Sequence, residues 1–262
     1  MAQTQIRFQD GAGYERMMGV WSRIAGKDFL DWVAPRTGMR WIDVGSGNGA
    51  FTELLAAHCA PSEIQGIDPS QAQLDFARGR QVAAPVTFQK ADAMALPFGD
   101  DSFDAAVMAL VIFFVPDPVK GVAEMARVVK PGGIVSAYAW DAPGGGLPAA
   151  PIHLEMRALG VTPPLPPSFD ASRLESLQEL WTGAGLEAVE TTAITVERTF
   201  AGFDEFWEIN QLGSSIADAI ATMSPADAAT LKSRVRARMP TDAAGRITAS
   251  ARANAVKGRM PG

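Results

Sequence analysis

The chain has 262 residues, of which 47% are hydrophobic and 20% are charged. This length and composition predict a globular protein with a sizeable buried core and exclude a disordered or fibrous chain. The formal net charge of −6 argues against a nucleic-acid binder, whose affinity for phosphates would rest on clustered lysine and arginine.

Short apolar strands alternate with helical stretches between residues 38 and 141. We predict strands at 40–44, 64–67, 86–88, 103–110 and 134–140, and helices at 50–59, 69–80 and 119–129. The triplet Pro131-Gly132-Gly133 stops the last of these helices before the fifth strand. This rhythm is typical of a parallel sheet that helices cover on both faces.

The character of the chain changes after residue 141. Residues 142–170 are rich in prolines and glycines, which predicts a long excursion rather than sheet. The remaining predicted elements are a helix at 173–182, a strand at 186–199, a helical insertion at 203–239 and a last strand at 246–256. The lysines and arginines from Lys232 to Arg259 are spaced like a solvated helix face and a strand rim, so we predict no nucleic-acid partner.

Cysteine content and the length of apolar segments both bear on the cellular location of the protein. Cys59 is the single cysteine, which excludes an intrachain disulfide and a zinc site of four cysteines. The longest apolar run, residues 105–115, is too short to cross a bilayer, and the polar N-terminus carries no secretory signal. We therefore predict a cytoplasmic protein without a membrane span.

The first predicted strand runs into a glycine-rich turn, Gly45-Ser46-Gly47-Asn48-Gly49. Glycines let the backbone approach a ligand closely, and the following helix directs its positive N-terminus at polar ligand groups. Read through Ala50, the turn also fits the dinucleotide fingerprint, and Asp68 lies where that fingerprint expects its ribose acid. A nicotinamide-dependent oxidoreductase therefore stays open on the turn alone.

Three acidic residues, Asp43, Asp68 and Asp92, fall at the carboxyl ends of three successive predicted strands. A buried carboxylate such as Asp43 costs free energy unless it is paired, and a cationic amine in the ligand is a natural partner. The alternatives are structural. Asp68 and Asp92 could cap the next helix or turn, and Asp43 could bond only its neighbouring backbone.

Together these residues resemble the class I S-adenosylmethionine-dependent methyltransferases, in particular the type 11 enzymes related to ubiquinone and menaquinone biosynthesis. The matching segments within residues 38–140 are WIDVGSGNG, GIDPS, KADAMALPF, FDAAVMALVIFFVPDP and VVKPGG. The resemblance implies an α/β, Rossmann-like sheet of seven mostly parallel strands with helices on both faces and an antiparallel last strand. It implies one methyltransferase domain over residues 1–262. Its parts are a donor-binding core at 38–141, an N-terminal helical cap at 1–37 and acceptor-side segments at 142–170 and 201–242.

The resemblance also implies contacts with the methionine moiety of S-adenosylmethionine, whose product is S-adenosylhomocysteine. Asp43 would lie near its amino group, to which the carbonyl of Leu110 would also bond. Arg23 would pair with its carboxylate. The backbone of the turn would line it at Gly45, Ser46 and Gly47.

The adenosine end of the donor would be held by residues after the second and third strands. Asp68 would accept from both ribose hydroxyls, which suits the two oxygens of a carboxylate. Pro69 would lie against one adenine face, while Asp92 and the N–H of Ala93 would bind its polar edge. Met94 would pack nearby.

Candidate acceptor contacts come from segments that the sheet does not need. They are aromatic: Tyr14, Trp21, Trp140, Phe203, Phe206 and Trp207. We predict that the N-terminal helix and the 203–239 insertion form a lid, although ordinary packing would explain the same residues. His153 is the candidate general base, and a lone surface histidine is the alternative. The apolar residues 112–115 stand where related enzymes often carry a histidine, which favours a hydrophobic acceptor cavity or, equally, core.

The predicted reaction is in-line methyl transfer to a small, apolar or aromatic acceptor, in a monomer or homodimer. Such a site must align nucleophile, methyl group and sulfur and exclude water. We predict no metal, because Asp117 and Asp141 have no third acidic partner. The alternatives are the oxidoreductase and a noncatalytic module that binds S-adenosylmethionine.

Overall fold

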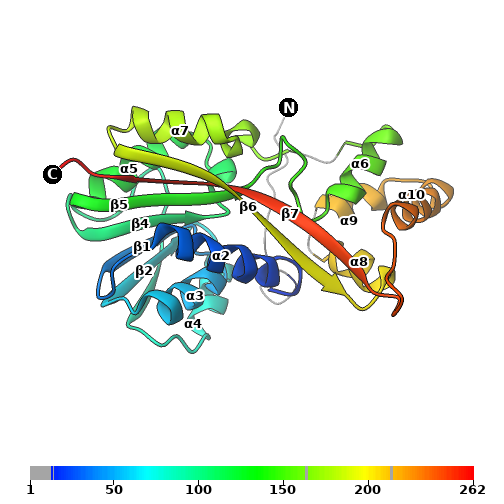
Figure 1. The fold of residues 1–262 in the computed structure, drawn as a ribbon, viewed down its shortest axis with the longest axis horizontal. Coiled ribbons are helices and arrows are strands. Elements are labelled where there is room, and N and C mark those ends of the chain that lie inside the picture. The colour runs from blue at the N-terminus through cyan, green and yellow to red at the C-terminus, as the bar shows by residue number, and fades with distance from the viewer. Residues whose placement is uncertain (1–12, 14, 163–164, 213–214) are drawn as a thin grey trace.

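The computed structural model describes residues 13, 15–162, 165–212 and 215–262. Seven strands form one sheet in the order β3-β2-β1-β4-β5-β7-β6 (Figure 1). Neighbours among β1 to β5 pair in parallel, whereas β7 runs antiparallel to both β5 and β6. The predicted seven-stranded, mostly parallel sheet with an antiparallel last strand is therefore confirmed.

The elements follow the predicted alternation. The strands are β1 (Arg40–Val44), β2 (Glu63–Asp68), β3 (Val86–Lys90), β4 (Phe103–Ala109), β5 (Val129–Trp140), β6 (Glu187–Phe200) and β7 (Ile247–Arg259). The α-helices are α2 (Val20–Val33), α3 (Ala50–Cys59), α4 (Gln71–Arg78), α5 (Pro118–Val128), α6 (Ala150–Ala158), α7 (Leu174–Gly183), α8 (Phe203–Ile209), α9 (Ser215–Ala221) and α10 (Pro225–Arg238). A π-helical turn, η1 (Glu15–Gly19), precedes α2, and the 3-10 turns are η2 (Ile112–Phe114) and η3 (Phe169–Ser172).

Alternating side chains of β1 divide the core into two layers. Trp41 joins the cluster that includes residues of α2 and α3, whereas Ile42 and Val44 join the cluster that includes residues of α5 and α7. All three side chains are fully buried, as expected for a central strand that is covered on both faces. The predicted helices on both faces of the sheet are thus present (Figure 1).

The predicted excursion and helical insertion contain further detail, and the start of the fifth strand was predicted too late. Residues 142–170 contain the helix α6, because Ile152 and Met156, four residues apart, bury one face of it completely. The 203–239 insertion is divided into the three helices α8, α9 and α10. β5 begins at Val129 rather than at residue 134, because a register shift opposite Phe103 and Ala105 accommodates the glycine turn within the strand.

The hairpin of β6 and β7 extends further than the neighbouring strand β5. β5 ends at Trp140, which pairs with Ala253, while β6 and β7 stay paired as far as Phe200 and Ile247. The hairpin therefore projects beyond the carboxyl edge of the parallel strands. It carries α8, α9 and α10 with it, and α6 lies at the same end (Figure 1).

Within the described ranges, no helix combines the length and apolar character that crossing a membrane requires.

Candidate functional site

The glycine turn adopts a backbone that favours glycine. Gly45, Gly47 and Gly49 have φ angles of +81°, +52° and +78°, in the left-handed region that side chains rarely adopt. A Cβ atom at Gly45 would lie 2.5 Å from Cγ2 of Val111. At Gly47, no described atom lies within 4 Å of that position. Gly45 is thus required by packing, whereas Gly47 presents an open face of the turn.

The amides of the turn bond the end of β2. The N–H groups of Gly45 and Ser46 both donate to the carbonyl of Ile67 at 2.8 Å. The N–H of Gly47 donates to Oδ2 of Asp68 at 3.0 Å. These three amides are therefore engaged within the protein, and the turn offers a ligand the surface of its Cα atoms.

Asp43 is completely buried in β1. Thr52 Oγ1 of α3 donates to its Oδ2 at 2.6 Å, while Oδ1 has no partner among the described residues. Burial raises the pKa of Asp43 to about 7, against the Thr52 hydrogen bond, and the charge of Asp68 raises it further. An orphaned buried acceptor fits a cationic amine. The alternative of a bond to neighbouring backbone is not what the structure shows, since its partner is a side chain.

The carboxylate of Asp68 accepts hydrogen bonds from two loops. Its Oδ1 accepts from the N–H of Ser70 at 2.8 Å, and its Oδ2 accepts from Gly47. Burial raises the pKa of Asp68, although both amide bonds lower it. The structural role is therefore present. Each oxygen keeps a further lone pair, so the ribose contact stays a prediction, as does the adenine contact of Pro69.

Asp92 also serves a turn. Its Oδ1 accepts from the N–H of Met94 at 2.8 Å, and its side chain is exposed. Ala93 lies between them and is partly buried. The turn follows β3, at the same sheet edge as Asp43 and Asp68. The three predicted acids thus lie at the ends of neighbouring strands, and the contacts of Asp92 and Ala93 with adenine stay predictions.

Leu110 directly follows β4 and has a left-handed conformation. Its φ is +63°, and its N–H donates to the carbonyl of Tyr138 at 2.7 Å. Such a backbone is strained for a residue with a Cβ. The strain turns the chain out of the sheet at the carboxyl edge, next to the end of β1. The predicted carbonyl contact of Leu110 remains consistent with this position.

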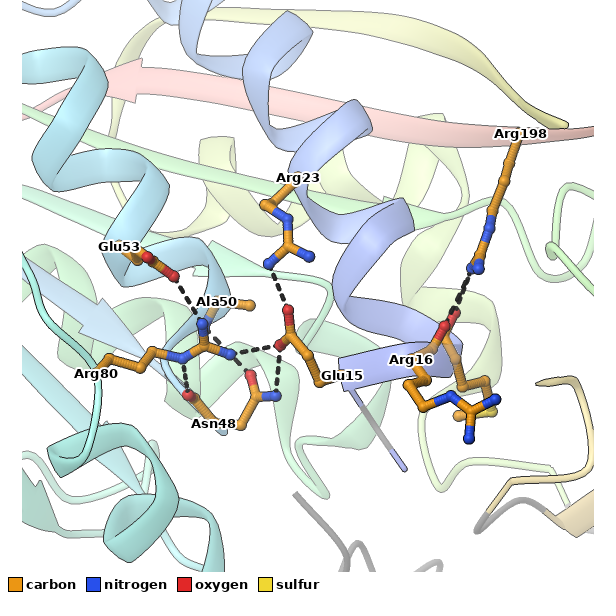
Figure 2. A network of polar contacts seen from close by, with 9 residues as sticks. Glu15, Arg16, Arg23, Asn48, Ala50, Glu53, Arg80 and Arg198 are labelled. Atoms are coloured by element: carbon orange, nitrogen blue, oxygen red, sulfur yellow. Dashed lines mark hydrogen bonds and ion pairs between the residues drawn. The ribbon is translucent and has the colours of Figure 1, made fainter. Parts of the chain in front are cut away.

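Arg23 belongs to a network that the sequence did not reveal. Its guanidinium pairs with Glu15, whose carboxylate also binds Arg80 and Asn48 (Figure 2). Asn48 belongs to the glycine turn, and its amide oxygen accepts from the N–H of Ala50 at 3.2 Å. Arg23 is thus joined to the glycine turn through Glu15, while its pairing with a donor carboxylate stays a prediction.

The predicted acceptor aromatics are core residues in this structure. Trp21 and Trp140 are at most 2% exposed, and their rings meet edge-to-face at 6.2 Å between centroids. Phe203, Phe206 and Trp207 of α8 are also buried. Ordinary packing therefore accounts for them, and contact with an acceptor, like the lid itself, stays a prediction. The remaining candidate, Tyr14, lies outside the described residues.

His153 lies on α6, at the end of the molecule where the hairpin of β6 and β7 projects (Figure 1). Burial lowers its pKa to about 4, and the nearby charge of Arg157 lowers it further. The imidazole is therefore neutral near pH 7, and no side chain in the described part of the chain hydrogen-bonds it. A neutral ring can accept a proton, but the low pKa makes it a weak base. Its catalytic role stays a prediction.

The apolar residues after β4 pack into the sheet. Ile112 and Phe113 are buried in the cluster that covers the α5 and α7 side. The backbone N–H of Ser168 donates to the carbonyl of Phe113 at 3.1 Å, so the end of the segment 142–170 is bonded to η2. These contacts favour the core alternative over an acceptor cavity at this point.

The basic side chains of α10 are paired with acidic residues. Lys232 and Arg236 both bind Asp204 at 2.9 Å, and Arg234 and Arg238 both pair with Glu155 of α6. The basic helix α10 is therefore largely neutralised by contacts within the protein.

The two acidic residues considered as metal ligands also have structural partners. Asp117 caps α5 by accepting from the N–H of Lys120 at 3.1 Å, and Asp141 pairs with Arg252. Within the described ranges, no three histidine, cysteine or acidic residues gather as a metal site would require.

The part of the chain that holds the glycine turn and the three acids is similar to known methyltransferases. Residues 42–137 match the family model of a methyltransferase domain. A demethylmenaquinone methyltransferase from Clavibacter sepedonicus is 36% identical over 148 residues, which cover 56% of this chain and 60% of that protein. The chain spans between 39% and 60% of the length of the first curated relatives that it matches.

Solved structures share the fold at low sequence identity. A methyltransferase structure from Bacillus halodurans superposes with a TM-score of 0.59 at 18% identity and covers 90% of this chain and 99% of its own. The [4+2]-cyclase SpnF superposes with a TM-score of 0.53 at 23% identity, over 90% of this chain and 79% of its own. The predicted methyltransferase resemblance and the Rossmann-like fold are confirmed, while the fold by itself does not specify the reaction.

Proposed function

We propose that this chain, whose residues 42–137 match the family model of a methyltransferase domain, transfers a methyl group from S-adenosylmethionine to a small, apolar or aromatic acceptor. One observation carries the donor assignment. The buried carboxylate of Asp43, beside the glycine turn, has one oxygen without a partner in the described part of the chain. An ammonium group satisfies such an oxygen, and the methionine moiety of the donor carries one.

The other predicted donor contacts suit the arrangement at the sheet edge. The open face of Gly47 lets the methionine moiety approach the backbone, beside Gly45 and Ser46. Asp68 binds the ribose hydroxyls with the lone pairs that its amide bonds leave free. The contacts with adenine come from the loops after β2 and β3, at Pro69, Asp92, Ala93 and Met94. Bound there, S-adenosylmethionine supplies an electrophilic methyl group on a sulfonium.

The acceptor would bind where α6, α8 and α10 project beyond the sheet. The residues of this end need to orient the acceptor and exclude water, because methyl transfer is a displacement in line with the leaving sulfur. A protein base is required only where the acceptor is not already nucleophilic. His153 is the available candidate. The relative named above acts on demethylmenaquinone by its name, which makes hydroquinones a suitable acceptor class to test first.

A transfer assay tests this function. The full chain is incubated with S-adenosylmethionine labelled in the methyl group and a panel of phenols, hydroquinones and aromatic amines. We expect label in at least one acceptor, with one S-adenosylhomocysteine formed per methyl group. Tight donor binding without any acceptor in a broad panel would favour the noncatalytic binding module, and the assignment to methyl transfer would be wrong. The cytoplasmic location and the choice between monomer and homodimer stay predictions.

A further inference from the structure

Glu15 lies at the centre of a polar network beside the glycine turn (Figure 2). Its Oε1 pairs with Nη1 of Arg23, which belongs to α2. Its Oε2 pairs with Nη2 of Arg80 and accepts from Nδ2 of Asn48 at 3.0 Å. One carboxylate therefore connects the N-terminal turn η1, the helix α2, the segment after α4 and the glycine turn.

The backbone of η1 is shaped around this carboxylate. A Cβ atom at Gly19 would lie 2.6 Å from both Cδ and Oε2 of Glu15, so glycine at this position lets the side chain lie across the turn. The turn is also held from β6, where Nη1 of Arg198 donates to the carbonyls of Arg16 and Met17 at 3.2 Å (Figure 2). Glu15 is therefore fixed by its own backbone as well as by its partners.

The two arginines that share Glu15 differ in how fully they are engaged. Arg80 is 11% exposed and also binds Glu53 at 2.6 Å and the carbonyl of Asn48 at 2.5 Å. Arg23 is 41% exposed, and its contact with Glu15 uses one of its five N–H groups. The other four have no partner among the residues that the structure describes. Arg80 is thus held by several partners. Arg23 keeps N–H groups that are available to a ligand, and these form its free edge.

We propose that Glu15 is a positioning residue for the donor. It holds the Arg23 guanidinium beside the glycine turn and leaves its free edge to bind the carboxylate of the methionine moiety. A guanidinium that is already oriented loses less side-chain freedom when it binds a carboxylate. This inference rests on the proposed function and concerns the carboxylate end of the donor alone.

Two ligands that differ only in the carboxylate test the inference. S-adenosylmethionine and decarboxylated S-adenosylmethionine are titrated calorimetrically into the wild-type chain, Glu15→Gln and the control Glu53→Gln. We expect Glu15→Gln to weaken binding of S-adenosylmethionine about tenfold, as for a lost charge-assisted contact, and to leave the decarboxylated ligand within about twofold. Glu53 binds Arg80 without touching Arg23, so Glu53→Gln should leave the ratio of the two affinities unchanged.

A double variant tests whether Glu15 acts through Arg23. Arg23→Gln should weaken S-adenosylmethionine at least as much as Glu15→Gln, and the double variant should show no further loss, because both substitutions remove one interaction. Gly19→Ala displaces the Glu15 carboxylate without changing its charge and should show the same preference between ligands. It serves in place of Glu15→Gln if that variant does not fold.

Several results would overturn the inference. Equal weakening of both ligands by Glu15→Gln would show a merely structural role, and unchanged binding of S-adenosylmethionine would show no role. A wild-type protein that binds both ligands equally well would show that the donor carboxylate finds no partner. A wild-type protein that binds neither S-adenosylmethionine nor S-adenosylhomocysteine would instead contradict the proposed function, and this inference with it.

Discussion

Asp43 couples the protonation of the site to the stability of the fold. Burial raises its pKa from 3.8 to about 7. Between these two values the folded chain binds more protons at this position than the unfolded chain does. The contribution of Asp43 to the free energy of unfolding is therefore largest below about pH 4 and is lost as the pH rises to about 7.

Asp43→Asn tests this coupling. The amide oxygen still accepts from Thr52, but the group no longer titrates. We expect the free energy of unfolding of the wild type to fall relative to that of the variant between pH 4 and pH 7, by a few kcal/mol in order of magnitude. Urea unfolding at several pH values measures this difference. Parallel pH profiles would show that Asp43 titrates normally in the folded protein.

Asp68 is expected to serve both the fold and the donor. Asp68→Ala removes the acceptor of the Gly47 and Ser70 amides together with the predicted ribose contact. We expect donor binding to weaken by about 1–3 kcal/mol, the usual cost of leaving polar partners unpaired. Titration calorimetry with S-adenosylhomocysteine measures this loss. Asp75→Ala, an exposed acid on α4, is the control, and unchanged affinity in Asp68→Ala would remove the ribose assignment.

At the scale of elements, α8 is held in place by its aromatic face. Phe206 is fully buried, and its ring meets that of Phe200 edge-on at 5.3 Å. Phe206→Ala should lower the free energy of unfolding by about 3–5 kcal/mol. Phe76→Ala, whose ring is 38% exposed, should lower it much less. Equal effects in denaturant unfolding would show that α8 does not pack as a core helix.

Strong local patterns made some elements predictable. The predicted bounds of β1 and α3 agree with the structure, because an apolar strand, a glycine turn and a helix follow one another without a break. The helix α6 lies among prolines and glycines, which concealed its buried face. The division of the insertion into separate helices was overlooked, although Ser224 and Pro225, which begin α10, are a recognisable signal for a helix start.

The positions of the three acids were predictable from strand order, but their hydrogen bonds were not. The network around Glu15 joins residues 33 and 65 positions apart in the chain, and no local pattern relates them. The aromatic residues of α8 were predictable as an apolar stripe. Their burial was not, because it depends on how the insertion packs against the hairpin of β6 and β7.

At the scale of the molecule, two groups of elements meet at one end of the sheet. The carboxyl edge of β1, β2 and β3 presents acids and a glycine turn, while the overhanging hairpin and α6 lie at the same end of the molecule (Figure 1). The similarity to a cyclase as well as to methyltransferases means that this fold serves more than one reaction. The ligand that binds at this sheet edge must therefore be measured directly.

Calorimetric titration of the full chain with S-adenosylmethionine, S-adenosylhomocysteine and NADH at pH 7 shows which class of ligand the sheet edge binds. We expect both adenosyl compounds to bind with one site per chain and NADH to give no binding heat. Asp43→Asn should weaken both adenosyl compounds, because their ammonium group loses a carboxylate. Binding of NADH in place of the adenosyl compounds would show that the site does not serve S-adenosylmethionine.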